Sequence, residues 1–242
     1  MRHIFIREFS AFLHSLIAYV VIGVFLTAMG LLVWVFPETS VLDYGYADLG
    51  TFFSLAPYVF IFLIPAITMR SFAEEKRAGT MELLLTRPLT DGDIIGGKYL
   101  ASLMLVVVSV LPTWVYYFSL RVLGDPPGNI DTSGVAGSYI GLLLLGSVFC
   151  AIGLIASAIT TNQIVAFILA AFLCFLMFSG FESVSNLNLW STQVIIIKQF
   201  GIQYHYESLG RGLVDSRDLV YFLSASAFFL LITKTIIGSR SW

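Results

Sequence analysis

Charged side chains are scarce in this sequence. Only 12% of the 242 residues are Asp, Glu, Lys or Arg, and 58% are hydrophobic, whereas roughly a quarter of an average soluble domain is charged. The formal net charge of −2 gives no electrostatic reason to expect nucleic acid as a partner. The composition therefore indicates an integral membrane protein that binds no nucleic acid.

Side chains that could bind a metal or transfer a proton are also few. The two cysteines, Cys150 and Cys174, lie inside apolar runs, where we interpret them as packing residues. His205 lies outside the predicted spans, and the other two histidines lie at or before the first one. An ion-coupled carrier or a haem subunit needs ionisable groups or histidine ligands within its spans. We therefore expect surface or interfacial histidines and a non-catalytic protein without a cofactor of its own.

Long windows without Asp, Glu, Lys or Arg define the predicted membrane spans. These windows hold 29 residues after Glu8, 21 after Asp48, 22 after Lys98 and 50 after Asp131. Because a helix needs about 20 residues to cross a bilayer, the longest window contains two spans, divided at the polar cluster 160–163. A shorter apolar window of 15 residues follows later in the chain. The prediction is an all-α polytopic membrane protein, a single six-span domain over residues 1–242, with spans at 16–36, 51–69, 99–120, 138–159, 164–181 and 219–237.

The distribution of basic residues predicts the orientation of these spans. If the amino terminus is cytosolic, nine of the 13 Lys and Arg residues fall in cytosolic segments and four in external ones. Cytosolic loops of membrane proteins carry an excess of Lys and Arg. We therefore expect both termini in the cytosol.

One stretch matches most of a phosphate-binding loop. Gly92, Gly97 and Lys98 fit the pattern G-x-x-x-x-G-K, but Tyr99 replaces the Ser or Thr that would hold magnesium. No β-strand is expected before the stretch, and a membrane span follows it. We therefore expect that this chain does not hydrolyse nucleotide by itself.

The predicted cytosolic loop at 70–98 combines charged and apolar residues. Gly79 suits the end of a helix, Thr80 can cap a short second helix, and Pro88 would end that helix. The short helix, 81–86, is too brief to span the membrane and too apolar to be left in water. It either lies on the inner leaflet or under the spans, or it docks into a cytosolic partner. The candidate coupling residues are Glu74, Glu75, Lys76, Arg77, Gly79, Thr80, Glu82, Leu83, Leu84, Leu85 and Pro88.

The same loop carries a family resemblance. The run Phe-Ala-Glu-Glu-Lys-Arg-x-Gly-Thr-x-Glu-Leu-Leu-Leu-Thr-x-Pro, followed by Gly-Lys-Tyr at the start of the third span, resembles the coupling region of ABC-2 type permeases. Stretches at 43–49, 128–131, 162–168 and 208–212 are similar to the smaller permease subunit of the gliding-motility-associated ABC transporter. The similarity extends over essentially the whole chain. One departure is Leu16, where relatives often carry Pro.

The resemblance implies an ABC-2, type V exporter-like permease fold with six spans and no ATPase of its own. ATP and magnesium would be bound by a separate ABC ATPase, present in two copies. The chain would pair with a second six-span permease, as a heterodimer or a homodimer, in the lipid bilayer of a bacterial inner membrane.

The resemblance also implies two segments outside the spans. An amphipathic interfacial helix is expected at 1–15, with Phe5, Arg7, Glu8, Phe9 and Phe12 as its characteristic residues. An external loop that partly re-enters the membrane is expected at 182–218, with Trp190, Ile196, Phe200, Ser208, Gly210 and Arg211.

Three classes of function are open at this point. The first is a permease subunit that couples ATP hydrolysis by a partner to transport or to gliding-motility or secretion machinery. The second is a scaffold or force-transmitting membrane subunit that uses the same architecture and releases no solute. The third, a membrane enzyme, is disfavoured because Glu74, Glu75 and Glu82 lie beside Lys76 and Arg77, a pattern typical of a solvated or docking surface.

Overall fold

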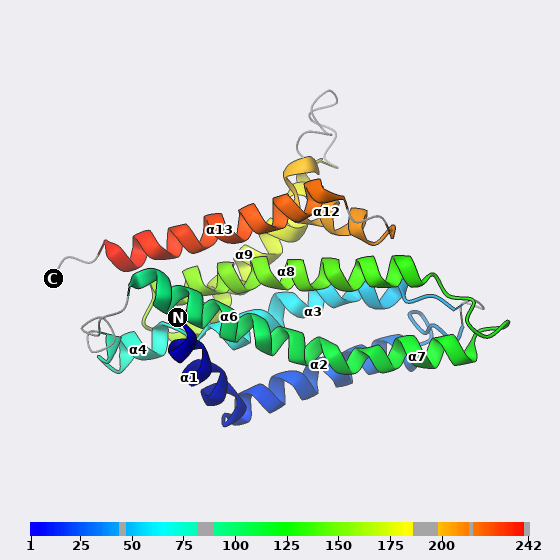
Figure 1. Ribbon diagram of the computed structural model, residues 1–242, viewed down its shortest axis with the longest axis horizontal. Coiled ribbons are helices and arrows are strands. Elements are labelled where there is room, and N and C mark those ends of the chain that lie inside the picture. Colours follow the sequence, from blue (N-terminus) through cyan, green and yellow to red (C-terminus); the bar gives the residue numbers. More distant parts are fainter. Residues whose placement is uncertain (44–46, 82–89, 186–197, 213–214, 240–242) are drawn as a thin grey trace.

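The chain forms an elongated bundle of long helices in the computed structural model (Figure 1). The structure describes residues 1–43, 47–81, 90–185, 198–212 and 215–239. Within these ranges every regular element is helical, and no β-strand occurs.

Six helical stretches of the described chain are long and apolar enough to cross a membrane, which confirms the predicted all-α fold with six membrane-crossing helices. The first, fourth and sixth are single helices, and the other three are built from consecutive elements. They are α2 (Leu16–Trp34), α3 (Gly50–Thr68) with α4 (Ala73–Arg77), α6 (Asp91–Val110) with η1 (Leu111–Thr113) and α7 (Trp114–Leu123), α8 (Thr132–Ile159), α9 (Gln163–Phe175) with η2 (Leu176–Gly180) and α10 (Phe181–Ser185), and α13 (Ser216–Gly238). The remaining described helices are α1 (Arg2–Leu13) and α12 (Ile202–Leu209).

The core of the bundle is α8, which has 28 residues and packs against α3, α6, α9, α12 and α13. Its most apolar window is 83% buried, against 28% for α2, 22% for the stretch from α9 to α10 and 22% for α13. Glycines allow the neighbouring helices to come close. A Cβ atom at Gly153 would overlap the hydroxyl of Thr68 on α3, and one at Gly137 would overlap the carbonyl oxygen of Leu209 on α12.

Polar residues placed just outside the helices fix where several of them begin. Asn162 accepts a hydrogen bond from the Ile164 amide at the start of α9, within the polar cluster predicted to divide two spans. Asp131 caps α8 in the same way. Gly79 follows α4 with a φ of +66°, which a residue with a side chain rarely adopts, so the predicted helix end is confirmed.

The two ends of the bundle carry different elements. One end holds α1, α4 and the beginning of α6 (Figure 1). The other holds the end of α7 and the beginning of α8. These are called the α4 end and the α7 end below.

Candidate functional site

A buried lysine lies at the centre of the α4 end. The side chain of Lys98, on α6, is only 2% exposed. Its Nζ donates to Glu75 Oε1 at 2.9 Å, to Glu8 Oε1 at 3.2 Å and to the carbonyl oxygen of Ser71 at 2.6 Å. The Phe72 ring centroid lies 5.2 Å from the same nitrogen. An ammonium group removed from water is costly unless it is paired and hydrogen-bonded, and here all three of its protons have acceptors.

A second cation completes the group of charges. Arg7 Nη2 lies 2.5 Å from Glu8 Oε1 and 3.4 Å from Glu75 Oε1. The set Arg7, Glu8, Glu75 and Lys98, called the Lys98 junction below, therefore holds two positive and two negative groups. Because its members come from α1, α4 and α6, the junction ties these three helices together.

Apolar contacts next to the junction also hold its helices together. Ile4 of α1, Phe72, and Ile94 and Ile95 of α6 belong to one buried cluster that also includes residues of α8 and α13. At Gly97 of α6, an added Cβ would lie 2.7 Å from Ile4 Cγ2, so α1 rests directly on the α6 backbone. Gly97 and the lysine after it, which match the phosphate-binding pattern, thus have packing and pairing roles in this fold.

The short helix α4 is also fixed to α8. The hydroxyl of Ser157 accepts from the amides of Phe72 at 2.9 Å and Ala73 at 3.1 Å. It donates to the carbonyl of Met69 at 3.0 Å. Lys76 Nζ donates to the carbonyl oxygen of Ala158, near the end of α8. A helix of five residues is too short to be stable by itself, so these bonds to α8 hold α4 in place.

The predicted coupling residues divide into two groups. Glu75 and Lys76 are partly buried and bond within the chain. Glu74, Arg77, Gly79 and Thr80 are exposed. Glu82, Leu83, Leu84, Leu85 and Pro88 lie outside the described residues.

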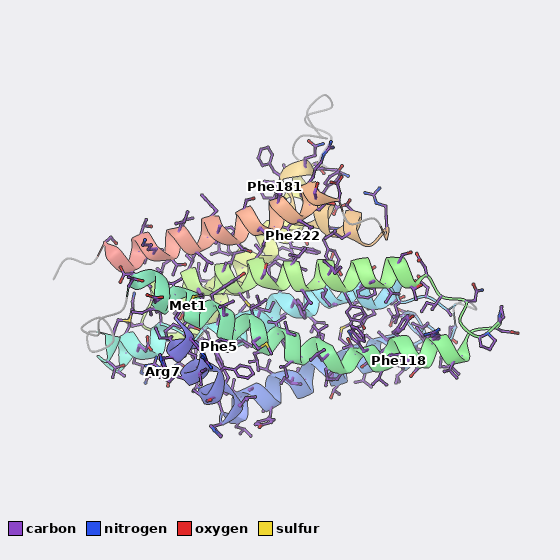
Figure 2. All side chains as sticks on the ribbon, viewed as in Figure 1. Met1, Phe5, Arg7, Phe118, Phe181 and Phe222 are labelled. Atoms are coloured by element: carbon purple, nitrogen blue, oxygen red, sulfur yellow. The ribbon has the colours of Figure 1, made fainter. Side chains whose placement is uncertain are left out.

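The five residues predicted for an interfacial helix fall on α1, and Figure 2 labels two of them, Phe5 and Arg7. The Phe5 and Phe9 rings stack with centroids 5.8 Å apart, and Phe12 packs against the main core. Arg7 is exposed, whereas Glu8 points inward to the Lys98 junction. Glu8, a polar residue of this helix, is therefore used for a contact inside the protein.

Four of the residues predicted for the re-entrant loop are described by the structure, and they lie in or next to α12. The carbonyl of Phe200 accepts from the hydroxyl of Tyr221 at 2.7 Å. Gly210 and Arg211 follow α12 and are exposed, and the carbonyl of Ser208 accepts from the Arg211 amide at 3.2 Å. Trp190 and Ile196 lie outside the described residues.

Sequence reasoning missed the role of two residues at this site. From the sequence, Lys98 is expected at the start of the third span, and no hydrogen-bonding role is predicted for Ser157. The signal for Lys98 is its position, since a lysine directly after Gly96 and Gly97 enters an apolar window and needs an anionic partner there. Ser157 shows no such signal, because its partners are main-chain atoms of another helix.

Comparison with known proteins agrees with this architecture. Residues 49–232 match the family model described as ABC-2 family transporter protein. The matched range contains Glu75, Lys98 and Ser157, while α1 and α2 precede it. None of the curated proteins matches the chain. Because the family match covers well over half of the 242 residues, the chain belongs to the ABC-2 transporter family.

Proposed function

We propose that this chain is the membrane-spanning permease subunit of an ABC transporter, and that a separate ATPase docks at its α4 end. Membership of the ABC-2 family makes the chain a component of membrane transport. The observation that carries the proposal is the Lys98 junction together with the Ser157 bonds, because they join α4 to α1, α6 and α8. A push on α4 would therefore reach three other helices.

In this proposal the ATPase contacts the exposed side of α4 and the segment after it. Glu74 and Arg77 supply exposed charges of opposite sign, and Leu83 and Leu84 supply the apolar anchors. Buried apolar contacts usually dominate the energy of an interface, and charges at its rim set orientation. ATP and magnesium are held by the ATPase, and its closure moves α4 as a lever whose two positions belong to the whole complex.

The proposed assembly contains two ATPase copies and a second six-span permease, which is either another protein or a second copy of this chain. The little-buried helices α2, α9 and α13 leave apolar sides that suit lipid and this partner. We place the complex in a bacterial inner membrane with both termini and the α4 end in the cytosol, as the Lys and Arg distribution favours. From the sequence resemblance, we also propose that the complex couples ATP hydrolysis to transport or to gliding-motility or secretion machinery.

The docking proposal is tested by co-purification from the native cells. A tagged chain carrying Leu83→Asp and Leu84→Asp should lose the ATPase by about tenfold or more, because two charges would be forced into an apolar interface. The matched control is Leu42→Asp with Leu123→Asp, two leucines that are 60% and 61% exposed near the α7 end. Normal ATPase recovery with the first pair, at normal membrane abundance, would show that segment 82–85 lies on the membrane surface instead.

The orientation is tested separately with single cysteines at Arg77 and Asp131. The two native cysteines are buried, so they contribute little background. An impermeant thiol reagent added to intact cells should label Asp131→Cys and leave Arg77→Cys unlabelled. Labelling of Arg77→Cys from outside would reverse the proposed orientation.

A further inference from the structure

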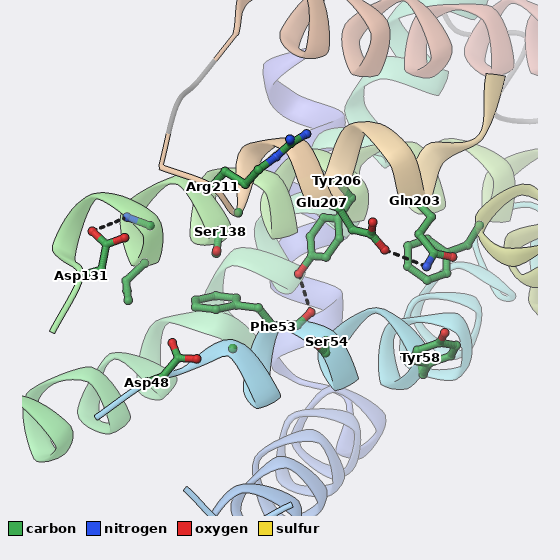
Figure 3. A pocket seen from close by; sticks show the side chains of 15 residues that line it. Asp48, Phe53, Ser54, Tyr58, Asp131, Ser138, Gln203, Tyr206, Glu207 and Arg211 are labelled. Carbon is green, nitrogen blue, oxygen red and sulfur yellow. Dashed lines mark hydrogen bonds between the residues drawn. The ribbon is translucent and has the colours of Figure 1, made fainter. Parts of the chain in front are cut away.

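A cavity of about 450 Å³ lies toward the α7 end between α3, α8 and α12 (Figure 3). This volume falls within the range of about 300–1,000 Å³ that is typical of small-molecule sites. Three elements each bring one carboxylate to its lining: Asp48 precedes α3, Asp131 precedes α8, and Glu207 lies on α12. The cavity is far from the Lys98 junction and shares none of its residues.

The charge around this cavity is unbalanced. Among the described residues that line it, Arg211 is the one cation, and it forms no ion pair there with Asp48, Asp131 or Glu207. Its guanidinium is turned toward the outer side of α12 (Figure 3). Hydrogen bonds from the Ser133 hydroxyl and from main-chain amides lower the pKa of Asp131, so this carboxylate stays ionised. The cavity therefore attracts positive charge.

The hydroxyl of a largely buried serine also lines the cavity without a partner among the described residues. Ser138 on α8 is only 6% exposed, and its side chain forms no hydrogen bond with any part of the chain that the structure describes. Figure 3 shows it directed into the space above Phe53. The Ser138 hydroxyl is therefore free to form a hydrogen bond with a ligand in the cavity.

Aromatic rings form the other wall. The Tyr206 hydroxyl donates to the carbonyl of Phe53 at 2.7 Å, and burial raises the pKa of Tyr206, so this proton stays in place and the hydroxyl is already used. Tyr58 packs edge-on against Phe178 with ring centroids 5.7 Å apart. These rings offer apolar faces to the carbon skeleton of a ligand and to a nearby cation.

The carboxylates do not converge on a point. No group of three His, Cys, Asp or Glu side chains in the described residues is arranged to hold a metal ion. A ligand that satisfies this lining must therefore be extended, with its charge in one part and its hydrogen-bonding groups in another.

We propose that this cavity binds an organic ammonium group carried on a hydroxylated body of about the size of a hexosamine. The ammonium lies in the negative field of Asp48 and Glu207, a hydroxyl bonds to Ser138, and the carbon skeleton lies against the aromatic wall. The site does not depend on docking of an ATPase at the α4 end. In the orientation proposed above it opens to the outside.

The test measures labelling of a cysteine in the cavity, with the full chain in its native membrane. Ser54 lines the cavity and is exposed, so Ser54→Cys is modified with a cationic and with an anionic methanethiosulfonate reagent. Asn129→Cys, in the exposed turn before α8, is the control position. We measure the ratio of the modification rate with the cationic reagent to that with the anionic reagent. We expect this ratio to be about tenfold higher at position 54 than at position 129.

Glucosamine, buffered so that its amine is protonated, is then added as the probe, and glucose is the neutral control. We expect glucosamine to slow modification at position 54 and glucose to leave it unchanged. Asp48→Asn with Glu207→Gln should abolish this protection, and Ser138→Ala should raise the glucosamine concentration that it requires. ATPase recovery with each variant shows that the chain is folded, and these residues are not part of the α4 end.

Three results would overturn the site. They are no protection by glucosamine, equal protection by glucose, and protection that survives the loss of both carboxylates. Each of them leaves the ATPase-docking proposal intact, while loss of docking with intact glucosamine protection would overturn only that proposal.

Discussion

The two ends of the bundle use their few charged residues in opposite ways. At the α4 end, Lys98 is 2% exposed and each charge of the junction faces an opposite one within 3.4 Å. At the α7 end, Asp48, Asp131 and Glu207 are exposed around a cavity, with no ion pair between them and Arg211 in the described chain. Ion pairing makes the first group a mechanical connection. Its absence leaves the negative charge of the second group available to a cationic ligand, although Asp131 also caps α8 and Glu207 accepts a hydrogen bond from Gln203.

The difference follows from desolvation. A buried ammonium must be compensated inside the protein, so the position of Lys98 dictates where Glu8 and Glu75 lie. Exposed carboxylates keep their water and need no such partner. We therefore expect substitutions at the α4 end to change stability and substitutions at the α7 end to change ligand binding.

The largest effect is expected for Lys98→Ala, which removes the buried cation of the junction and leaves Glu8 and Glu75 to share the exposed Arg7. Removing one partner of a buried ion pair costs about 3–5 kcal/mol. Thermal or denaturant unfolding of the purified chain measures this loss. Lys234→Ala, at an exposed lysine of α13, is the control and should unfold like the unmodified chain.

Adding Glu8→Gln and Glu75→Gln to Lys98→Ala should restore part of the lost stability, because the two partly buried carboxylates no longer repel each other and Arg7 is exposed enough to be solvated. A Lys98→Ala variant that unfolds with the Lys234→Ala control would contradict the junction. So would a triple variant less stable than Lys98→Ala.

The second largest effect is expected for Ser157→Ala. The buried amides of Phe72 and Ala73 would lose their acceptor, at a cost of about 2–3 kcal/mol. Ser109→Ala is the matched control, since the buried Ser109 hydroxyl only donates back to its own helix at Leu105. Proteolysis within 70–81 should become faster in Ser157→Ala membranes and stay unchanged in the control. Equal stability of the two variants would show that α4 is held without Ser157.

Much of the fold could be predicted because membrane spans are local signals. The charge-free windows correspond to the six candidate spans, and the cluster at 160–163 contains the turn between α8 and α9. Gly79 marks a helix end because its conformation with positive φ needs no other part of the chain. Window length and helix-ending residues are properties of neighbouring residues, so no tertiary information was required.

The candidate site could be predicted only in part, since its contacts join distant segments. Glu8 and Lys98 are 90 positions apart, and Ser157 meets a segment 85 positions away. His205 shows the same limit. It was predicted to be a surface or interfacial residue, but its side chain is 14% exposed and its Nδ1 lies 2.6 Å from Asp218 Oδ1 on α13. Only the packing of α12 against α13 brings this pair together.

Substitution of one glycine near each end allows a direct comparison of the two ends, and we expect an intermediate loss of stability. Gly153→Ala would press against Thr68 on α3, and Gly137→Ala against the Leu209 carbonyl on α12. Overpacking of this kind costs about 1–3 kcal/mol. Gly23→Ala on α2, where an added Cβ meets nothing within 4 Å, should be neutral or stabilising by up to about 1 kcal/mol.

The readouts of the two variants should differ. Gly153→Ala should reduce ATPase recovery, because α8 also holds α4. Gly137→Ala should instead reduce glucosamine protection of Ser54→Cys, because it moves α12 away from the cavity. Identical effects of both variants on both readouts would remove the functional distinction between the ends.

The smallest effect is expected for Asn162→Ala, which removes the hydrogen bond to the Ile164 amide at the start of α9. Loss of such a cap costs about 1 kcal/mol, and Asn162→Asp should restore most of it because Asp is an equally good cap. Asn162 shares no hydrogen-bond partner with the Lys98 junction, so its effect should add to that of Lys98→Ala. Denaturant unfolding of the single and double variants measures the sum. A double variant that deviates from additivity by more than about 0.5 kcal/mol would mean that the junction extends to α9, and that the α4 end is a larger rigid unit than its ion pairs define.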